Sequence, residues 1–173
     1  MEKKSALLVG VGGQGAILTA KVLVNGLMKA GYDVKVSEVH GMSQRGGSVV
    51  TYVRAGEKVF SPVIEKGEAD VMISFEPLES ARWLPYLKKG GKMIVNIQRI
   101  DPMPVITGVM KYPENLIEKM EALGVKIDAI DALALAEEAG TSKAVNMVLM
   151  GRLSKYFALS EGAWMAAIEA CVP

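Results

Sequence analysis

The sequence has few of the residues on which redox, metal and covalent chemistry depend. Its 173 residues contain one cysteine, Cys171, and one histidine, His40. A single thiol excludes an internal disulfide, and it excludes an iron–sulfur cluster built within the chain, because a cluster needs several thiolates. The sequence also has no His, Cys and Asp residues grouped at ligand spacing, which argues against a self-contained zinc site. We therefore expect neither metal ligands nor a complete catalytic set.

The sequence also lacks a charge excess and a long hydrophobic run. Its formal net charge is +1, from 20 Lys and Arg against 19 Asp and Glu, so no basic field favours nucleic acid. No run of about 18 apolar residues could span a bilayer, and the N-terminus has no signal-peptide pattern. We expect a cytoplasmic protein without a nucleic-acid or membrane partner. Hydrophobic residues make up 50% of the chain, which is enough for a single packed domain over 1–173.

The most informative pattern that is present is a glycine turn. Residues 10–15 read GVGGQG, directly after the apolar segment 6–9 and directly before a helical pattern. Glycines let backbone N–H groups approach a phosphate closely, and the start of a helix adds partial positive charge. The turn predicts a site for a nucleotide or cofactor phosphate, and a plain tight turn without a ligand is the alternative.

Strand and helix patterns alternate along most of the chain. The helix after the turn is closed by Gly31, and a strand over 34–39 fits a right-handed strand–helix–strand parallel unit. Residues 49–53 and 59–60, joined by a turn at Gly56, predict a β-hairpin. Later strands are expected at 71–75, 93–97 and 125–130, and helices at 78–87 and 114–123. Asp131 is expected to cap a further short helix, and residues 141–172 are expected to form two helices that separate near Ser160, with Thr141 or Ser142 and Ser160 as their N-caps. Pro77 is expected to begin the helix at 78–87, Gly90 and Gly91 to end it, and Glu76 and Glu79 to act mainly as capping carboxylates.

These patterns predict an α/β fold: a three-layer domain with a mostly parallel, Rossmann-like sheet, a β-hairpin excursion and C-terminal helices. A second glycine-rich loop, residues 40–47, is expected beside the first, at the carboxyl ends of adjacent parallel strands. Arg45 in this loop is suited to grip a phosphate bidentately, or else to pair with a carboxylate. The candidate binding residues are Gly10, Gly12, Gly13, Gln14, Gly15, Ser43, Arg45, Gly46 and Gly47.

Two further interpretations remain open from the residues alone. Glu38 lies near the end of the second strand, where a dinucleotide-binding domain keeps its ribose-binding acid, so an independent NAD- or FAD-binding module is one alternative. A structural or interaction protein with an empty glycine turn is the other. The hairpin in place of the next helix, and the lack of room for a substrate domain, argue against hydride transfer by this chain alone.

Two motifs together resemble a known family. They are the turn at 10–15 and the segment 37–49, SEVHGMSQRGGSV, with the likeness continuing through 69–77 and 86–96. The chain resembles the small subunit of 2-oxoacid:ferredoxin oxidoreductases, most of all the indolepyruvate oxidoreductase beta subunit, which is homologous to the pyruvate oxidoreductase gamma subunit. The first motif is weakly specific and the second strongly so.

The resemblance implies oxidative decarboxylation of a 2-oxoacid to its acyl-coenzyme A, with electrons passed to ferredoxin. It implies that thiamine diphosphate and 4Fe-4S clusters belong to a larger partner subunit, and that the isolated chain is inactive and holds no catalytic or metal-ligating residue. Coenzyme A (CoA) binding has been connected with the related gamma domain. A phosphate-suited crevice between Gly12–Gly15 and Arg45–Gly47 is compatible with CoA as a ligand of this chain.

Overall fold

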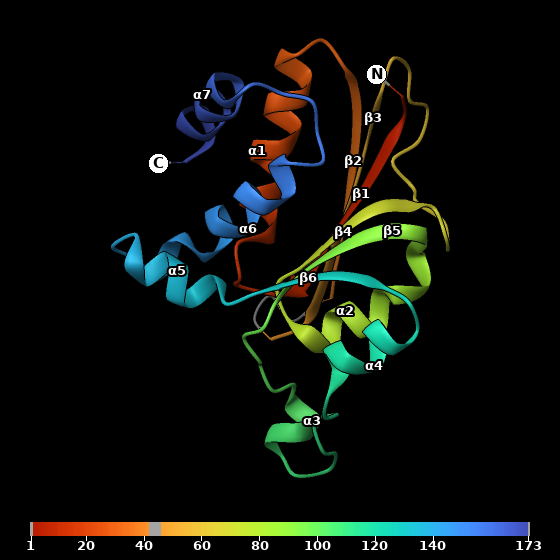
Figure 1. Ribbon diagram of the computed structural model, residues 1–173, viewed down its shortest axis with the longest axis vertical. Coiled ribbons are helices and arrows are strands. Elements are labelled where there is room, and N and C mark those ends of the chain that lie inside the picture. Colours follow the sequence, from red (N-terminus) through yellow and green to blue (C-terminus); the bar gives the residue numbers. More distant parts are fainter. Residues whose placement is uncertain (1, 42–45, 173) are drawn as a thin grey trace.

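The computed structural model describes residues 2–41 and 46–172, which form a mixed sheet with helices on both faces (Figure 1). The sheet has six strands in the order β2-β3-β1-β4-β5-β6. They are β1 (Lys4–Val11), β2 (Asp33–His40), β3 (Ser48–Gly56), β4 (Ala69–Ser74), β5 (Leu87–Asn96) and β6 (Lys126–Ile130). The pairings β1–β4, β4–β5 and β5–β6 are parallel, whereas β3 is antiparallel to both β1 and β2. The predicted three-layer, mostly parallel α/β fold is confirmed.

The helices divide between the two faces of the sheet (Figure 1). One face carries α1 (Ala16–Lys29), α5 (Ala132–Glu138), η2 (Ser142–Ala144), α6 (Val145–Ser154) and α7 (Glu161–Cys171), and the other carries α2 (Pro77–Trp83), η1 (Leu84–Tyr86) and α4 (Leu116–Ala122). The short helix α3 (Met103–Ile106) projects away from the sheet. None of the helices that the structure describes is long and apolar enough to cross a membrane.

The central strand β1 is buried on both sides because each face of the sheet has its own core. Leu8 belongs to the core under α1, α6 and α7, whereas Leu7 and Val9 belong to the core under α2 and α4. Gly26 allows α7 to approach α1 closely, since a Cβ there would lie 3.3 Å from Trp164 Cζ3. This packing makes β1 and α1 the rigid support of the turn between them.

The predicted hairpin of 49–53 with 59–60 is wrong, and the antiparallel pair in this part of the sheet is β2 with β3. β3 pairs with β2, which precedes it, and residues 59–60 form no strand. The Val59 N–H is used elsewhere, because it donates to Asp33 Oδ2 at 2.8 Å. β3 also inserts between β2 and β1, so the predicted parallel unit of β1, α1 and β2 is wrong as a pair of neighbouring strands.

The predicted helix at 78–87 is too long. It ends at Trp83 and continues as the 3₁₀ turn η1, and β5 begins at Leu87, before the glycine pair. Gly90 has φ +79°, and the register between β4 and β5 shifts in this region. Gly90 and Gly91 therefore form an irregularity within β5 and do not end a helix as predicted. In sequence alone, glycines in such a strand irregularity look the same as glycines that end a helix.

The predicted helix caps are confirmed. Asp131 Oδ1 accepts a hydrogen bond from Ala134 N at 3.0 Å, and Ser160 Oγ accepts one from Ala163 N at 3.2 Å. Thr141 Oγ1 accepts one from Lys143 N at 3.3 Å, at the start of η2. These short polar side chains satisfy backbone donors that a helix start leaves without partners, which is why local sequence identified them.

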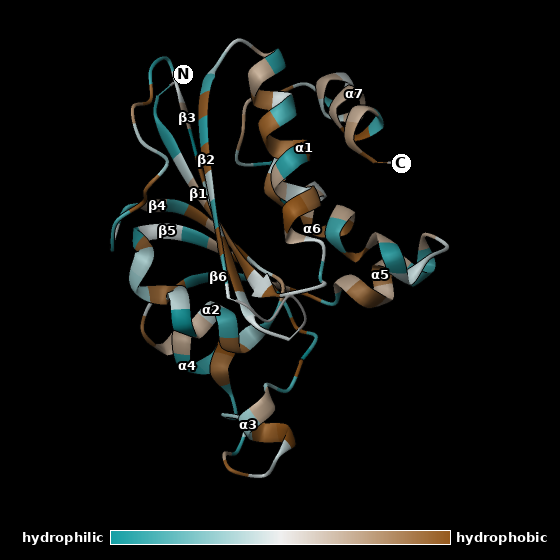
Figure 2. Ribbon diagram, turned by 180° about the vertical axis from the view of Figure 1, so that it is seen from behind, coloured by the Kyte–Doolittle hydropathy of each residue, from teal (hydrophilic) through white to brown (hydrophobic). Residues whose placement is uncertain are grey.

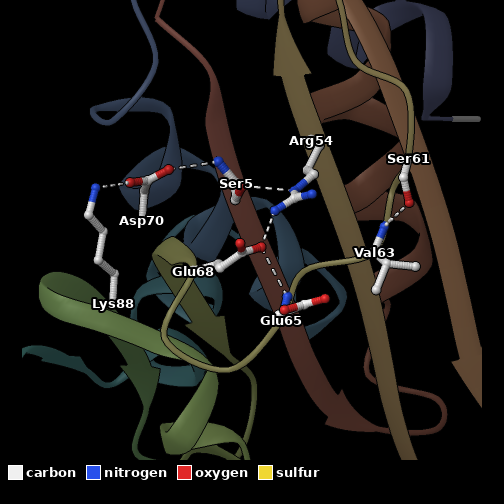
Figure 3. A network of polar contacts seen from close by, with 8 residues as sticks. All are labelled: Ser5, Arg54, Ser61, Val63, Glu65, Glu68, Asp70 and Lys88. Atoms are coloured by element: carbon white, nitrogen blue, oxygen red, sulfur yellow. Dashed lines mark hydrogen bonds and ion pairs between the residues drawn. The ribbon is translucent and has the colours of Figure 1, made fainter.

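A polar network joins four strands, β1, β3, β4 and β5, where β1 begins (Figure 3). Asp70 Oδ2 accepts from Ser5 N at 2.9 Å, and Asp70 Oδ1 lies 3.2 Å from Lys88 Nζ. Arg54 donates through Nε to Ser5 Oγ at 3.2 Å and forms an ion pair with Glu68. The network holds β1, β3, β4 and β5 together at the end of the sheet opposite the glycine turn.

Candidate functional site

The glycine turn lies at the point where the chain changes faces of the sheet. After β1 the chain continues into α1 on one face, and after β4, the parallel neighbour of β1, it continues into α2 on the other. The two connections leave the sheet in opposite directions, so the carboxyl ends of β1 and β4 bound a crevice, which is the usual ligand position in such sheets.

Gln14 connects the two sides of this crevice. Its Oε1 accepts from Val11 N at 2.8 Å, and its Nε2 donates to Phe75 O at 2.9 Å, just beyond β4. Gly10 lies beneath, buried in β1, where a Cβ would come within 2.9 Å of Phe75 Cβ. Gln14 and Gly10 therefore shape the turn, and Gly10 lines neither pocket beside it.

The outer part of the turn offers an open backbone surface. Gly13 is exposed, has φ +100°, and has nothing within 4 Å of its ideal Cβ position. Gly15, with φ +82°, is the N-cap of α1, which has no side-chain cap and no acidic residue in its first turn. Within the described residues, the first N–H groups of this 14-residue helix thus receive no side-chain cap and face no acid of their own turn, and the electrostatics favour a bound anionic group.

The last residues of the second glycine-rich loop contact the first glycine turn. Gly12 N donates to Gly47 O at 2.9 Å, and Gly46 has φ +77°. The two loops meet because β3, which begins at Ser48, is paired with the end of β1. They do not follow adjacent parallel strands as predicted, since β3 separates β2 from β1. Ser43 and Arg45, predicted to contact a phosphate, lie outside the described residues.

Two pockets flank the turn, and Gly13, Gln14 and Gly15 line both. The first, of about 580 Å³, is the Lys21 pocket, which also includes Val11, Gly12, Ala16, Ile17, Leu18, Lys21, His40 and Val49. The second, of about 550 Å³, is the Asn146 pocket, which also includes Gln98, Ile100, Leu133, Ser142, Lys143, Val145 and Asn146. Each is large enough for part of a small ligand. The residues that line the Asn146 pocket outside the turn could not be predicted from the sequence, because they come from three distant segments that share no motif.

Beside the crevice lies a buried carboxylate, Glu76, which is 0% exposed. Its Oε2 accepts from Glu79 N at 3.0 Å, and its Oε1 accepts from Ile100 N at 3.3 Å and from the Tyr112 hydroxyl. Burial and the Glu76 carboxylate both raise the pKa of Tyr112. The predicted capping role is confirmed for Glu76, which also anchors the segment 97–113 that carries α3.

Glu79 is the second buried carboxylate of this region. Burial raises its pKa, opposed by hydrogen bonding from Ser48 and by Arg82, whose Nη1 lies 3.4 Å from Glu79 Oε1. The Ser48 hydroxyl donates to Glu79 Oε2, which links the first residue of β3 to α2. Glu79 thereby supports the position at which the second glycine-rich loop ends.

The geometry does not favour a dinucleotide site at Glu38. This residue is exposed on β2, the edge strand, and β3 lies between it and the glycine turn. In a dinucleotide-binding domain the corresponding strand adjoins β1, which brings its acid to the ribose. Among residues 2–41 and 46–172, no group of three or more His, Cys, Asp or Glu residues is placed to hold a metal ion.

Comparison with solved structures identifies the same fold in oxidoreductases. The gamma subunit of a keto/oxoacid ferredoxin oxidoreductase from Geobacter sulfurreducens PCA has a TM-score of 0.70 and 20% identity, covering 98% of this chain and 87% of that chain. A 2-oxoglutarate:ferredoxin oxidoreductase from Magnetococcus marinus, solved with 2-oxoglutarate, CoA and succinyl-CoA bound, has a TM-score of 0.73 and 21% identity. That match covers 98% of this chain and 27% of the longer one.

Sequence comparison establishes the relationship itself. Indolepyruvate oxidoreductase subunit IorB of Thermococcus kodakarensis is 44% identical over 180 residues, covering 100% of this chain and 88% of the relative. The family model for pyruvate ferredoxin/flavodoxin oxidoreductase matches residues 5–173. The resemblance inferred from the two glycine-rich motifs is confirmed, and the chain belongs to the pyruvate ferredoxin/flavodoxin oxidoreductase family.

Proposed function

We propose that this chain is the small subunit of an indolepyruvate-type 2-oxoacid:ferredoxin oxidoreductase and that it binds CoA for the reaction. The observation that carries the proposal is the start of α1, which has no side-chain cap and follows the open glycine turn. This turn lies at the topological switch point of the sheet, where the connections after β1 and β4 leave on opposite faces. The CoA bound in the Magnetococcus marinus relative supports the choice of ligand. The 44% identity to IorB supports indolepyruvate as the type of oxoacid.

The chemical steps belong to a larger partner subunit in this proposal. That subunit carries thiamine diphosphate and 4Fe-4S clusters, cleaves the bond between the carboxylate and the oxo carbon of the 2-oxoacid, and passes the electrons to ferredoxin. The acyl group is transferred to the CoA thiol, with carbon dioxide as the other product. This chain contributes the CoA phosphate site, and oxoacid specificity lies mainly in the larger subunit.

Reconstitution tests the assignment. The full chain is mixed with the larger subunit, and ferredoxin reduction is followed with indolepyruvate, pyruvate and 2-oxoglutarate, each with and without CoA. We expect no turnover by this chain alone and CoA-dependent turnover, fastest with indolepyruvate, after mixing. Turnover that is unchanged when this chain is omitted would contradict the subunit role. Titration with NAD and FAD in the same buffer tests the dinucleotide alternative, for which we expect no binding at millimolar ligand.

A further inference from the structure

The glycine turn separates two pockets of different chemistry, and CoA has two chemically different halves on either side of its diphosphate. Both pockets share Gly13, Gln14 and Gly15. One extends toward α1, the end of β2 and the start of β3, and the other toward the segment after β5 and the start of α6. A diphosphate on the turn would therefore direct its adenosine 3′-phosphate half into one pocket and its pantetheine half into the other.

The Lys21 pocket matches an aromatic base that carries a phosphomonoester. Its walls include Ile17, which is 42% exposed, and Val49. No Asp or Glu lines it, and Lys21 forms no ion pair within residues 2–41 and 46–172. An apolar wall suits the face of a base, and a free ammonium group suits a phosphate dianion.

The Asn146 pocket matches a chain of neutral amides. Asn146 is 8% exposed and packs against Gly15, where a Cβ would lie 2.6 Å from Asn146 Nδ2. Its side-chain amide makes no hydrogen bond to any other residue of the described chain, and its polar atoms are not among the fully buried ones without a partner, so the amide is open to the pocket. Gln98 supplies a second amide to the pocket. The pantetheine half of CoA has two amides, each able to donate and accept, and would satisfy both side chains.

Resting on the proposed CoA function, we infer that Lys21 binds the 3′-phosphate of CoA and that Asn146 and Gln98 bind its pantetheine amides. The diphosphate then lies on the N–H groups of Gly13 and the first turn of α1. The thiol end leaves the molecule on the β5 side, next to the segment 97–113 that carries α3. This orientation presents the reactive sulfur to a partner placed at that side of the subunit.

Calorimetric titration of the full chain with CoA and with 3′-dephospho-CoA tests the position of the 3′-phosphate. For the wild type we expect CoA to bind about tenfold more tightly, the effect of one charged hydrogen-bonding partner. Lys21→Gln should remove this difference, whereas Lys143→Gln, the matched lysine of the other pocket, should retain it. A ratio that survives Lys21→Gln, or that is lost in Lys143→Gln, overturns the assignment.

Fragments of CoA test the other half. Gln98→Ala and Asn146→Ala should weaken binding of 4′-phosphopantetheine several-fold and leave binding of adenosine 3′,5′-bisphosphate unaffected. Lys21→Gln should weaken binding of adenosine 3′,5′-bisphosphate and leave binding of 4′-phosphopantetheine unaffected. Gln98 is only half-buried, so its variant remains informative if Asn146→Ala fails to fold. The opposite pattern overturns the orientation alone, because CoA still binds. Absence of CoA binding to the wild-type chain and to its complex overturns the proposed function as well.

Discussion

Gln14 is a structural residue of the turn as well as a neighbour of both pockets. Its amide joins the end of β1 to the backbone just after β4, accepting from Val11 N at 2.8 Å and donating to Phe75 O at 2.9 Å. A carboxylate keeps the first of these bonds and loses the second. It also places a negative charge beside the first turn of α1, where an anion is expected.

We therefore predict that Gln14→Glu lowers the free energy of unfolding by about 0.5–1.5 kcal/mol, because the Phe75 carbonyl loses one donor and keeps the other, Asn96 Nδ2 at 3.3 Å. The same variant should abolish measurable CoA binding through charge repulsion. Gln14→Met, of similar size and uncharged, is the control: it loses both bonds, so it should lose more stability than Gln14→Glu but retain more affinity. Denaturant unfolding and calorimetry measure the two effects. Wild-type CoA affinity in Gln14→Glu would contradict the placement of the phosphates.

Glu79 provides a prediction about pH. Burial raises its pKa, so the folded state holds the proton more tightly than the unfolded state, whose glutamate pKa is about 4.3. The stabilising contribution of the protonated form is complete below about pH 4 and is lost as the pH rises through the raised pKa of the folded state. Glu79→Gln keeps the protonated shape, so its stability relative to wild type should increase between about pH 4 and 7. The exposed Glu57→Gln is the control, and parallel curves for Glu79→Gln and wild type would show that the prediction is wrong.

At the scale of elements, the segment 97–113 is anchored at its base and apolar at its tip. Ile100 and Tyr112 both bond to the buried Glu76, and the segment extends beyond the sheet at α3, where Figure 2 shows hydrophobic ribbon. Ile106 is 64% exposed and Val109 is 79% exposed. Apolar side chains gathered in this way commonly mark a protein interface.

We predict that Ile106→Ser combined with Val109→Ser leaves the free energy of unfolding within about 0.5 kcal/mol of wild type, because neither side chain is buried. The same double variant should reduce assembly with the larger subunit, measured by co-purification and by turnover of the mixture. Phe60→Ser, which removes an 84% exposed aromatic residue from another part of the chain, is the matched control. Equal assembly of the double variant and the control would place the interface elsewhere.

Local signals identified most elements because their causes are local. Pro77, Asp131 and Ser160 begin helices through contacts within one turn, and the unbroken apolar run in β1 follows from its burial on both faces. The insertion of β3 between β2 and β1 is a long-range pairing that no short segment encodes. The same limit applies to the site: the turn could be predicted from residues 10–15, whereas Asn146 reaches it only through the packing of α6 on α1.

At the scale of the whole molecule, ligand binding and folding are coupled. A ligand that binds only the folded chain stabilises it by about 2.7 kcal/mol at one hundred times its dissociation constant. For a domain of this size, 1 kcal/mol corresponds to roughly 2–4 °C in Tm. CoA at that excess should therefore raise the Tm by roughly 5–11 °C, whereas NAD and FAD should not. Thermal unfolding monitored by calorimetry measures the shift, and an equal shift with NAD would favour the dinucleotide interpretation.

The polar network of Ser5, Arg54, Glu68, Asp70 and Lys88 has a practical consequence for joining other polypeptides to this fold (Figure 3). It holds the beginning of β1, and the 8-residue strand puts roughly 25 Å between that end and the glycine turn. A tag, a fluorophore or a whole domain attached before β1 would thus extend away from the turn and from α3. We expect covalent fusion at that end of the sheet to leave both the glycine turn and α3 accessible.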